Sequence, residues 1–416
     1  MFFGTGAGAG VFPAGVVVSQ GFRKHSKHDP ASPHMRIGVQ ILSLRPGQIG
    51  GQGIFIRRLL RELVPRLGED RLILFLRPEL ASEPWCRTMA EDDRVECIIE
   101  RPEAHYGGGY EVWNRQLLDR ASLDVVYFPL FFFFPRPLPV PVIIHVPDLL
   151  HEYYPDHFTS NELAWRRERI PESVAMADAV IVPTEFTKSC IRDRFGAADP
   201  SIHVMGEGGF LEDELDEDNK IPHLVDFPVG HLPFIFYPAA DWPHKNHETL
   251  IRAIAILKRQ GRPEHGVFTG ILSERGEALR HLADRLDVAD RVHFLGRVSQ
   301  HELIRLYRTA RLLAFPSRFE GFGIPLVEAM QLGCPIVASK AGAVMEVAGD
   351  AAIYCEDSPD DWAGTLADVL SDEDLLADLR CCGHKGATRF GWSHCVSRHL
   401  LLFRESGELT HTHESS

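Results

Sequence analysis

The sequence is poor in cysteine and in positive charge, and each shortage excludes a class of protein. Its eight cysteines are scattered over 416 residues without a C-x-x-C pair, so we expect free thiols in a reducing compartment rather than a disulfide framework. Asp and Glu outnumber Lys and Arg by 58 to 44, giving a formal net charge of −14. This excess argues against a general nucleic-acid binder but leaves room for a local basic pocket that binds a phosphate. The composition is otherwise that of a globular protein of about two or three domains.

The sequence also lacks an uninterrupted hydrophobic stretch of membrane-spanning length. The most apolar run, residues 127–146, contains four consecutive phenylalanines at 131–134 and five prolines between 129 and 141. Prolines remove amide donors and break helices, so we do not expect a transmembrane helix here. Two interpretations stay open: a buried strand end followed by a rigid proline loop, or an apolar surface that touches a lipid or a hydrophobic acceptor.

The first 34 residues show no sustained hydrophobic period and are rich in Gly, Ala, Ser and His. Their positive charges, Arg23, Lys24 and Lys27, follow the weakly apolar part, which is the wrong order for a secretory signal. A strand pattern begins abruptly at Met35. We therefore expect residues 1–34 to be a disordered leader, or the product of a misassigned start, and the fold to begin at Met35.

From Met35 onward, short apolar runs alternate with amphipathic segments in two series of similar size. The first series predicts strands at 36–42, 71–76, 95–99, 125–128, 142–145 and 179–183, and helices at 54–67, 162–176 and 186–194. The second predicts strands at 234–237, 267–272, 292–295, 312–315, 336–338 and 352–354, and helices at 247–258, 301–310, 324–331, 361–370 and 375–403. Strands that alternate with helices indicate parallel, doubly wound sheets.

This pattern predicts an α/β protein with two Rossmann-like domains, residues 35–210 and 231–390, that face a central cleft where ligands bind. The acidic run within 211–230 has no apolar face and predicts a solvated linker. Residues 391–416 would form a C-terminal helix and tail that crosses back to the first domain. The segments 216–218 and 372–374 formally match D-x-D, a metal-binding signature. The first lies in an acidic run, and the second lies in the expected first turn of a helix, where acidic residues interact favourably with the helix dipole. No metal site is therefore expected.

The most informative segment is FEGFGIPLVEAM at residues 319–330, which follows the predicted strand 312–315. A strand therefore ends, a glycine loop follows, and a helix opens near Gly323 with a proline in its first turn, where the missing amide costs nothing. The free amides of such a turn can bind phosphate. Carboxylates of Glu320 and Glu328 can accept hydrogen bonds from sugar or ribose hydroxyls. The alternative is a glycine turn flanked by two surface glutamates.

Glu320 and Glu328, separated by seven residues, resemble the E-x7-E signature of retaining GT-B glycosyltransferases of glycosyltransferase family 4. The resemblance extends over residues 35–403. The supporting segments match in the same order: GGQG at 50–53, PHKNH at 243–247, LGRV at 295–298, GCPIVA at 333–338 and EVAGDAA at 346–352.

The resemblance implies roles for individual residues. Glu328 would bind the ribose hydroxyls of a nucleotide, and Glu320 would bind hydroxyls of the donor sugar. Lys245 would neutralise the charge of the diphosphate. His145 would lie near the transferred sugar, with Asp148 and His151 as weaker candidates; His145, Glu320 and Lys245 are the catalytic candidates. The other donor-binding candidates are Gly51, Gly53, Arg297, Gly321, Phe322, Gly323, Ile324 and Leu326.

One feature of the family is missing. An arginine usually precedes the lysine by a few residues, whereas this chain has Ala-Ala-Asp-Trp at 239–242. Asp241 is an unfavourable neighbour for a diphosphate, and whether Arg297 compensates is left open. The missing arginine favours a non-catalytic protein that binds a nucleotide or a partner, while the joint presence of His145, Lys245 and the two glutamates favours a transferase. A sugar-nucleotide epimerase of the same fold is a further alternative.

The resemblance thus implies a retaining, metal-independent hexosyltransferase without a cofactor, with mannose as the favoured sugar. Its donor would be a nucleotide-diphosphate sugar and its acceptor a saccharide or a lipid-linked molecule, in bacterial polysaccharide biosynthesis. A phosphorylase of the same fold is a further alternative, but it is disfavoured because the chain shows no cofactor-lysine region. We expect a cytoplasmic protein, with peripheral contact to the inner face of a membrane left open, and no nucleic-acid partner.

Overall fold

The structure of the protein is a computed structural model, and it describes part of the chain. The described residues are 34–45, 50–102, 110–133, 137–196, 201–210, 214–215, 230 and 232–413. The expected leader, apart from His34, lies outside them, as do most of the expected linker 211–230 and the D-x-D match at 216–218.

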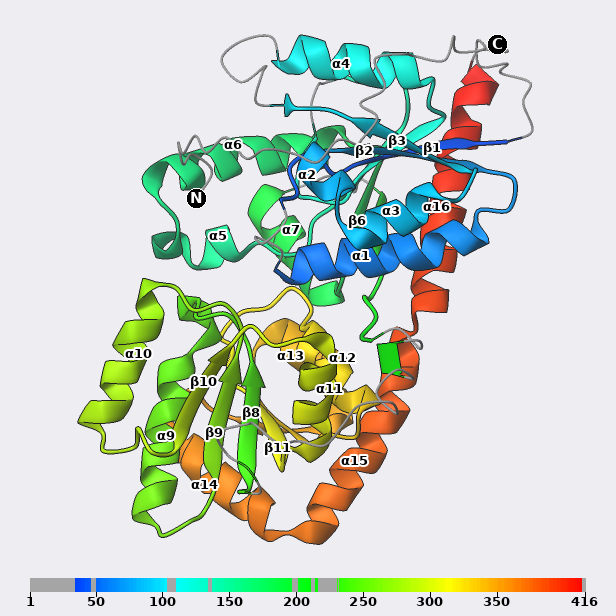
Figure 1. Cartoon of the computed structure of the whole chain (residues 1–416). Coiled ribbons are helices and arrows are strands. Elements are labelled where there is room, and N and C mark those ends of the chain that lie inside the picture. The colour runs from blue at the N-terminus through cyan, green and yellow to red at the C-terminus, as the bar shows by residue number, and fades with distance from the viewer. Residues whose placement is uncertain are drawn as a thin grey trace, which may run out of the picture. The chain divides into compact units, whose positions relative to one another are not determined.

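A seven-stranded sheet with the order β3-β2-β1-β4-β5-β6-β7 forms the centre of the first half (Figure 1). Its strands are β1 (Arg36–Gln40), β2 (Arg71–Leu76), β3 (Val95–Ile99), β4 (Val125–Phe128), β5 (Val142–His145), β6 (Ala179–Val182) and β7 (Ser201–Val204). All their pairings are parallel. The strand order reverses between β1 and β4, which is the position where such sheets bind ligands.

Helices cover both faces of this sheet (Figure 1). They are α1 (Gly51–Leu63), η1 (Val64–Arg66), α2 (Pro78–Ala81), α3 (Pro84–Ala90), α4 (Tyr110–Ala121), α5 (Leu150–Tyr153), η3 (Pro155–His157), α6 (Ser160–Met176) and α7 (Glu185–Phe195). The apolar side chains of α1, such as Phe55 and Leu59, recur at helical spacing and pack on one face, whereas Leu117 of α4 and Ile170 of α6 pack on the other. Because both faces are covered, a strand such as β4 is buried at every position.

The second half contains a six-stranded parallel sheet with the order β10-β9-β8-β11-β12-β13. Its strands are β8 (Phe234–Pro238), β9 (His265–Thr269), β10 (Val292–Gly296), β11 (Leu312–Phe315), β12 (Ile336–Ser339) and β13 (Ala352–Cys355). Its helices are η5 (Pro243–Lys245), α9 (His247–Arg259), α10 (Glu274–Arg285), α11 (Gln300–Thr309), α12 (Ile324–Gln331), α13 (Gly342–Ala348), η6 (Gly349–Ala351), α14 (Pro359–Ser371) and α15 (Glu373–Ala387). The predicted pair of Rossmann-like parallel-sheet domains is confirmed.

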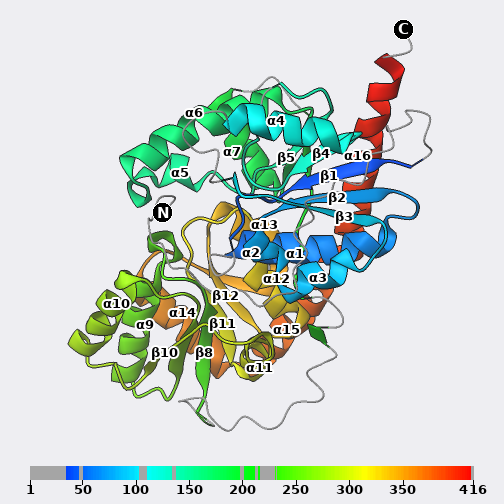
Figure 2. The same cartoon turned by 45° about the horizontal axis from the view of Figure 1, so that its top comes forward.

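The C-terminal helix α16 (Trp392–His413) follows α15 after the short turn η7 (Thr388–Phe390) and lies beside the first sheet and α1 (Figures 1 and 2). The Trp392 indole donates a hydrogen bond to the Gly209 carbonyl at 2.9 Å. Further along α16, the Phe403 ring packs against Tyr127 of β4. The C-terminal segment of the chain is therefore part of the core of its first half.

The sequence patterns located the twelve predicted strands, but they missed elements with a weak hydrophobic period. β7 has only four residues at the edge of its sheet, and α10 reads ERGEALRHLADR, with few apolar positions. The helices α4 and α13 were not predicted either. The predicted helix 375–403 is divided, because the chain is extended at Gly391.

The phenylalanine-rich run packs inward where the structure describes it. Phe133 is buried, with its ring centroid 5.6 Å from that of Phe128, and Phe131 is partly buried against the same core. The described part of the run therefore fits the buried strand end better than the apolar surface.

We predict that replacing Phe403 with alanine destabilises the protein by about 3–5 kcal/mol, because a large buried ring would leave a cavity. Its side chain is 1% exposed, whereas Leu401 on the same helix is 57% exposed. The control Leu401→Ala should change stability by less than about 0.5 kcal/mol. The measurement is the denaturant midpoint of unfolding, and equal effects of the two substitutions would contradict the assigned packing of α16.

Candidate functional site

The glycine loop after β11 opens directly into helix α12. Gly323 precedes this helix with φ of 102°, a left-handed conformation that favours glycine. No side chain caps the first turn, and Pro325 contributes no amide donor. The Leu326 amide, expected to hold a diphosphate, donates instead to the Gly323 carbonyl at 2.9 Å. The amides that are left for an anion therefore lie at the very start of the helix.

Gly321 lies where this loop touches the first half of the chain. A Cβ atom at Gly321 would stand only 1.7 Å from the carbonyl oxygen of Pro147, so no larger residue fits there. The Gly321 carbonyl accepts hydrogen bonds from the Thr184 and Thr187 hydroxyls at 2.8 and 3.2 Å. Glycine at this position is thus required by a close approach of two backbones.

Lys245 and Glu320, two of the three catalytic candidates, are in direct contact. The Lys245 Nζ atom donates to Glu320 Oε1 at 2.6 Å. They meet because β8 and β11 are neighbours in the sheet and both residues follow the carboxyl ends of these strands. Burial raises the pKa of Asp148 in the first half, while the charges of Arg166 and Lys245 oppose this shift. Asp148 therefore lies within the electrostatic reach of the pair.

Asp241 occupies the region where the family usually has an arginine, and its carboxylate is already engaged. Asp241 Oδ2 accepts hydrogen bonds from the Ser273 amide at 2.7 Å and from the Ser273 hydroxyl at 2.9 Å. Ser273 in turn caps helix α10. Asp241 thus fixes the start of α10. Arg297, the residue considered as a replacement for the missing arginine, is exposed directly after β10.

His145 makes no hydrogen bond to the Lys245–Glu320 pair. It is fully buried at the end of β5, and neither ring nitrogen has a hydrogen-bond partner among the described residues. Its ring centroid lies 4.9 Å from that of Phe55 on α1. Burial, helped by the nearby His399, lowers the pKa of His145 to about 3, so the imidazole is neutral near pH 7. His145 is therefore enclosed in the packing between the first sheet and its helices.

The weaker candidate His151 is also fully buried without a hydrogen-bond partner in the described structure. Burial is the largest cause that lowers its pKa, to about 3, with smaller contributions from Arg166 and Arg167. Its Nε2 atom lies 3.7 Å from Glu152 Oε1. Both buried histidines of this segment are thus neutral at physiological pH.

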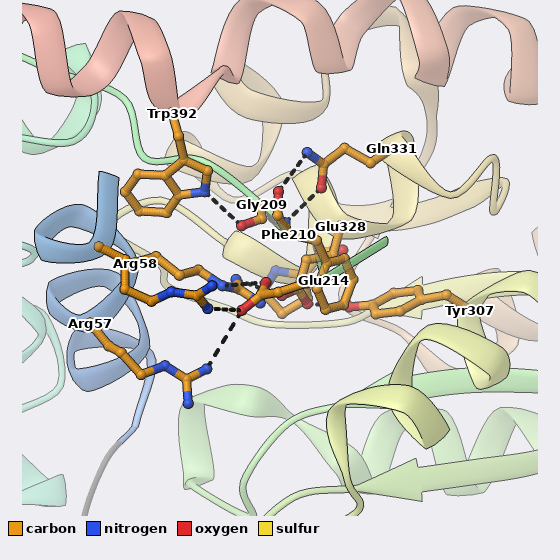
Figure 3. Close-up of polar contacts among 11 residues, drawn as sticks. Arg57, Arg58, Gly209, Phe210, Glu214, Tyr307, Glu328, Gln331 and Trp392 are labelled. Carbon is orange, nitrogen blue, oxygen red and sulfur yellow. Dashed lines mark hydrogen bonds and ion pairs between the residues drawn. The ribbon is translucent and has the colours of Figure 1, made fainter. Parts of the chain in front are cut away.

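Glu328 is almost completely buried and bridges the two halves of the chain (Figure 3). Its Oε1 accepts from Arg58 Nη1 of α1 at 3.1 Å, and its Oε2 accepts from the Tyr307 hydroxyl of α11 at 3.0 Å. Burial raises the pKa of Glu328, and Arg58 is the main group that opposes this shift. The carboxylate expected to bind ribose is therefore already held by a guanidinium and a phenol.

Arg58 also holds a second carboxylate, that of Glu214, at 3.1 Å (Figure 3). Glu214 belongs to the acidic run that was expected to be a solvated linker, but its side chain is only 5% exposed. The expectation of a solvated run is therefore wrong for Glu214, because a buried arginine attracts it. Arg58 was not among the predicted site residues, although its place one residue before Leu59 on the apolar face of α1 is an available signal.

Glu207 is a further buried carboxylate that the sequence analysis did not single out. It follows β7 in a glycine-rich segment, and burial raises its pKa to about 8, assisted by the charge of Asp148. A hydrogen bond with the Gln52 side chain of α1 acts in the opposite direction. A glutamate flanked by glycines at the end of a strand was the available signal.

The remaining donor-binding candidates lie at the start of α1 and α12. A Cβ atom on Gly51 would lie 4.0 Å from the Ile324 side chain, so the first turns of these two helices are close together. Gly53 and Ile324 are buried. Phe322 is also buried, and its ring centroid lies 5.4 Å from that of Phe390. Two helix starts that converge provide a positive potential for an anion.

Within the described ranges, no three His, Cys, Asp or Glu side chains are grouped so that they could hold a metal ion. Asp372, from the second D-x-D match, caps α15 by accepting from the Leu375 amide. None of the helices that the structure describes has both the length and the apolarity needed to span a membrane.

The two halves match two models of one enzyme class. Residues 49–208 match the model described as Glycosyltransferase Family 4, and residues 228–385 match the model described as Glycosyl transferases group 1. Two parallel Rossmann-like sheets with this signature define the GT-B fold. The chain belongs to the group 1 glycosyltransferases of family 4.

Similar proteins show how far this likeness extends. The chain is 24% identical over 256 residues to O-antigen chain mannosyltransferase B of Escherichia coli, covering 60% of this chain and 66% of that protein. It is 36% identical over 238 residues to D-inositol 3-phosphate glycosyltransferase of Mycolicibacterium vanbaalenii, covering 54% and 52%. The chain thus spans about half to two thirds of the length of these curated relatives.

Among solved structures, Anabaena HepE in complex with UDP-glucose superposes with a TM-score of 0.66 at 18% identity. The match covers 89% of this chain and all of HepE. At this identity the likeness shows a shared fold.

We predict that Arg58→Ala destabilises the protein by about 3–5 kcal/mol, because the buried Glu328 loses its counter-charge and Glu214 loses the nearest of its three arginines. Arg57, one position earlier, lies 3.9 Å from Glu214 with a side chain 34% exposed, so Arg57→Ala should cost less than about 1 kcal/mol. The defect of Arg58→Ala should shrink as the pH falls toward 5, because burial raises the pKa of Glu328 and the loss of Arg58 removes the main group that opposes this shift, so this carboxylate takes up a proton. Denaturant midpoints at pH 7.5 and 5 test this, and equal losses for both arginines would refute it.

We predict that Glu207 makes stability fall as the pH rises. Because burial raises the pKa of Glu207 from 4.5 to about 8, the folded state holds a proton that the unfolded chain releases at lower pH. The stabilisation is complete below about pH 4.5 and is lost as the pH rises through about 8. Glu207→Gln should flatten the stability profile between these limits. The exposed control Glu277→Gln should leave the slope unchanged, and an unaltered slope in Glu207→Gln would contradict the assignment.

Proposed function

We propose that the protein transfers a sugar from a nucleotide-diphosphate sugar to a saccharide or lipid-linked acceptor. The observation that carries this proposal is the contact of Lys245 with Glu320 at the carboxyl ends of β8 and β11, beside the uncapped start of α12. An ammonium group and helix amides can bind the negative charge of a diphosphate, and a carboxylate can accept hydrogen bonds from sugar hydroxyls.

In the proposed reaction, the bond between the anomeric carbon and the diphosphate breaks, the acceptor oxygen bonds to that carbon from the same face, and the hydroxyl proton passes to the departing diphosphate. The configuration at that carbon is retained. Lys245 and the first amides of α12 meet the charge that develops on the departing diphosphate, in place of a metal ion. Because Glu320 already touches Lys245, the donor sugar and its diphosphate would bind as one unit against this pair.

Donor binding would require a rearrangement at Glu328. The ribose hydroxyls would share or replace the hydrogen bonds that Arg58 and Tyr307 now make to this carboxylate. A carboxylate has about four acceptor positions, so it can keep Tyr307 and still bind ribose. The UDP-glucose complex of HepE supports a nucleotide-diphosphate sugar as the donor, and the mannosyltransferase relative favours mannose among the hexoses.

One observation favours a second function. The family arginine is absent, and Asp241 in its region is committed to Ser273. A protein with this weaker phosphate clamp could bind a sugar nucleotide without transferring the sugar, or act as an epimerase. Labelled donor incubated with a saccharide acceptor and a chelator separates transfer, epimerisation and binding alone.

We predict that Lys245→Ala lowers the transfer rate by about 100- to 1,000-fold, because one preorganised group loses contact with the developing charge. The control is Lys340→Ala, since Lys340 is half exposed and pairs with Glu356 on the surface. The measurements are turnover of labelled UDP-sugar and GDP-sugar, and thermal shift with UDP, GDP and ADP in the presence of chelator. Unchanged turnover and donor affinity in Lys245→Ala would contradict the proposed role.

A further inference from the structure

A basic pocket is lined in part by the neighbours of Lys245, namely Pro243, His244 and Asn246, but not by Lys245 itself. Its volume is about 270 Å³, just below the usual range of ligand sites, which begins at roughly 300 Å³. It is lined chiefly by the start of α9 and α10 and by the segments before α12 and α14, with two residues from the first half of the chain. The basic and ring-bearing residues in its lining are Tyr154, His157, His244, Arg252, Arg275 and Arg318.

The charges in this basic pocket do not cancel. Glu248 pairs with Arg275 at 3.0 Å, and Asp357 pairs with Arg318 at 2.7 Å. Arg252, exposed on α9, has no ion pair with any residue that the structure describes. In a chain with a net charge of −14, three arginines against two carboxylates concentrate positive charge in one small cavity.

The pocket also holds polar atoms that lack a partner. His244 is only 7% exposed, and its Nδ1 atom has no hydrogen-bond partner among the described residues. The ring of His157 stacks 5.8 Å from it, and its Nδ1 is likewise unpaired. Helix α9 begins at this pocket without a side-chain cap. Unpaired buried donors and acceptors are costly, so a bound polar ligand would stabilise this arrangement.

We propose that the basic pocket is a second anion site that binds a phosphate monoester, such as that of a phosphorylated sugar. Arginine forks match the oxygens of a phosphate, and the uncapped helix start adds positive potential. The site goes beyond the transfer reaction, because it is lined by neither Lys245 nor Glu320. It nevertheless adjoins that pair, since the Arg318 amide donates to the His244 carbonyl at 2.8 Å, next to Lys245.

The test uses the full-length protein, saturating UDP to occupy the donor site, and a chelator. Calorimetry with D-glucose 6-phosphate should show binding to the wild type in the presence of UDP. Arg252→Gln should weaken it by about tenfold or more, as expected for the loss of a charge-assisted hydrogen bond. Arg259→Gln removes the same charge from the exposed last turn of the same helix and should leave the affinity within about twofold, while UDP affinity should be unchanged in both.

Three outcomes would overturn the proposal: no binding of the sugar phosphate to wild type, equal weakening by Arg252→Gln and Arg259→Gln, or weakening by Lys245→Ala but not by Arg252→Gln. If UDP itself does not bind, the proposed donor site fails. Titration of D-glucose 6-phosphate without UDP still tests the pocket, because Arg252→Gln should weaken this binding and Lys245→Ala should not. Titration with inorganic phosphate shows whether the pocket recognises a phosphorylated saccharide or free phosphate. Preference for the sugar phosphate indicates a phosphorylated saccharide, and equal affinity indicates free phosphate; both support the site.

Discussion

The ion pairs of the buried Arg58 guanidinium are the interaction on which the arrangement of the two halves depends. It lies between the carboxylates of Glu214 and Glu328, which come from distant parts of the chain. A buried charge that lost these partners would be strongly destabilising, so α1 of the first half is held against α12 of the second. Further contacts reinforce this arrangement: the Glu346 carboxylate accepts from the first amides of α7 at 2.8 and 2.9 Å.

The acidic character of the chain shapes how its positive groups are used. Lys245 is paired with Glu320, and Arg318 with Asp357, so several basic groups near the proposed sites already have a carboxylate partner. An anionic ligand must therefore exchange with an internal carboxylate, use helix amides, or bind an exposed arginine such as Arg252. This arrangement keeps the positive charges solvated or paired when no ligand is bound, because an unpaired buried charge is unfavourable.

Much of the fold and part of the site could be predicted from local pattern. The buried strands are continuous apolar runs, so their positions were visible, while α10 was missed because its apolar face is narrow. Lys245 and Glu320 were both identified, and they meet because they follow adjacent strands. Gly321 was identified as part of a motif, but its need for glycine comes from Pro147, which lies far away in the sequence.

The amino-acid pattern alone specified two parallel α/β halves, the glycine loop before α12 and the family to which the chain belongs. Tertiary packing settled the surroundings of individual side chains: the apolar enclosure of His145, the engagement of Asp241 with Ser273, the burial of Glu214 and the raised pKa of Glu207. The reason is physical. Hydrophobic period and turn chemistry act over a few neighbouring residues, whereas burial, charge pairing and proton affinity depend on groups that only folding brings into contact.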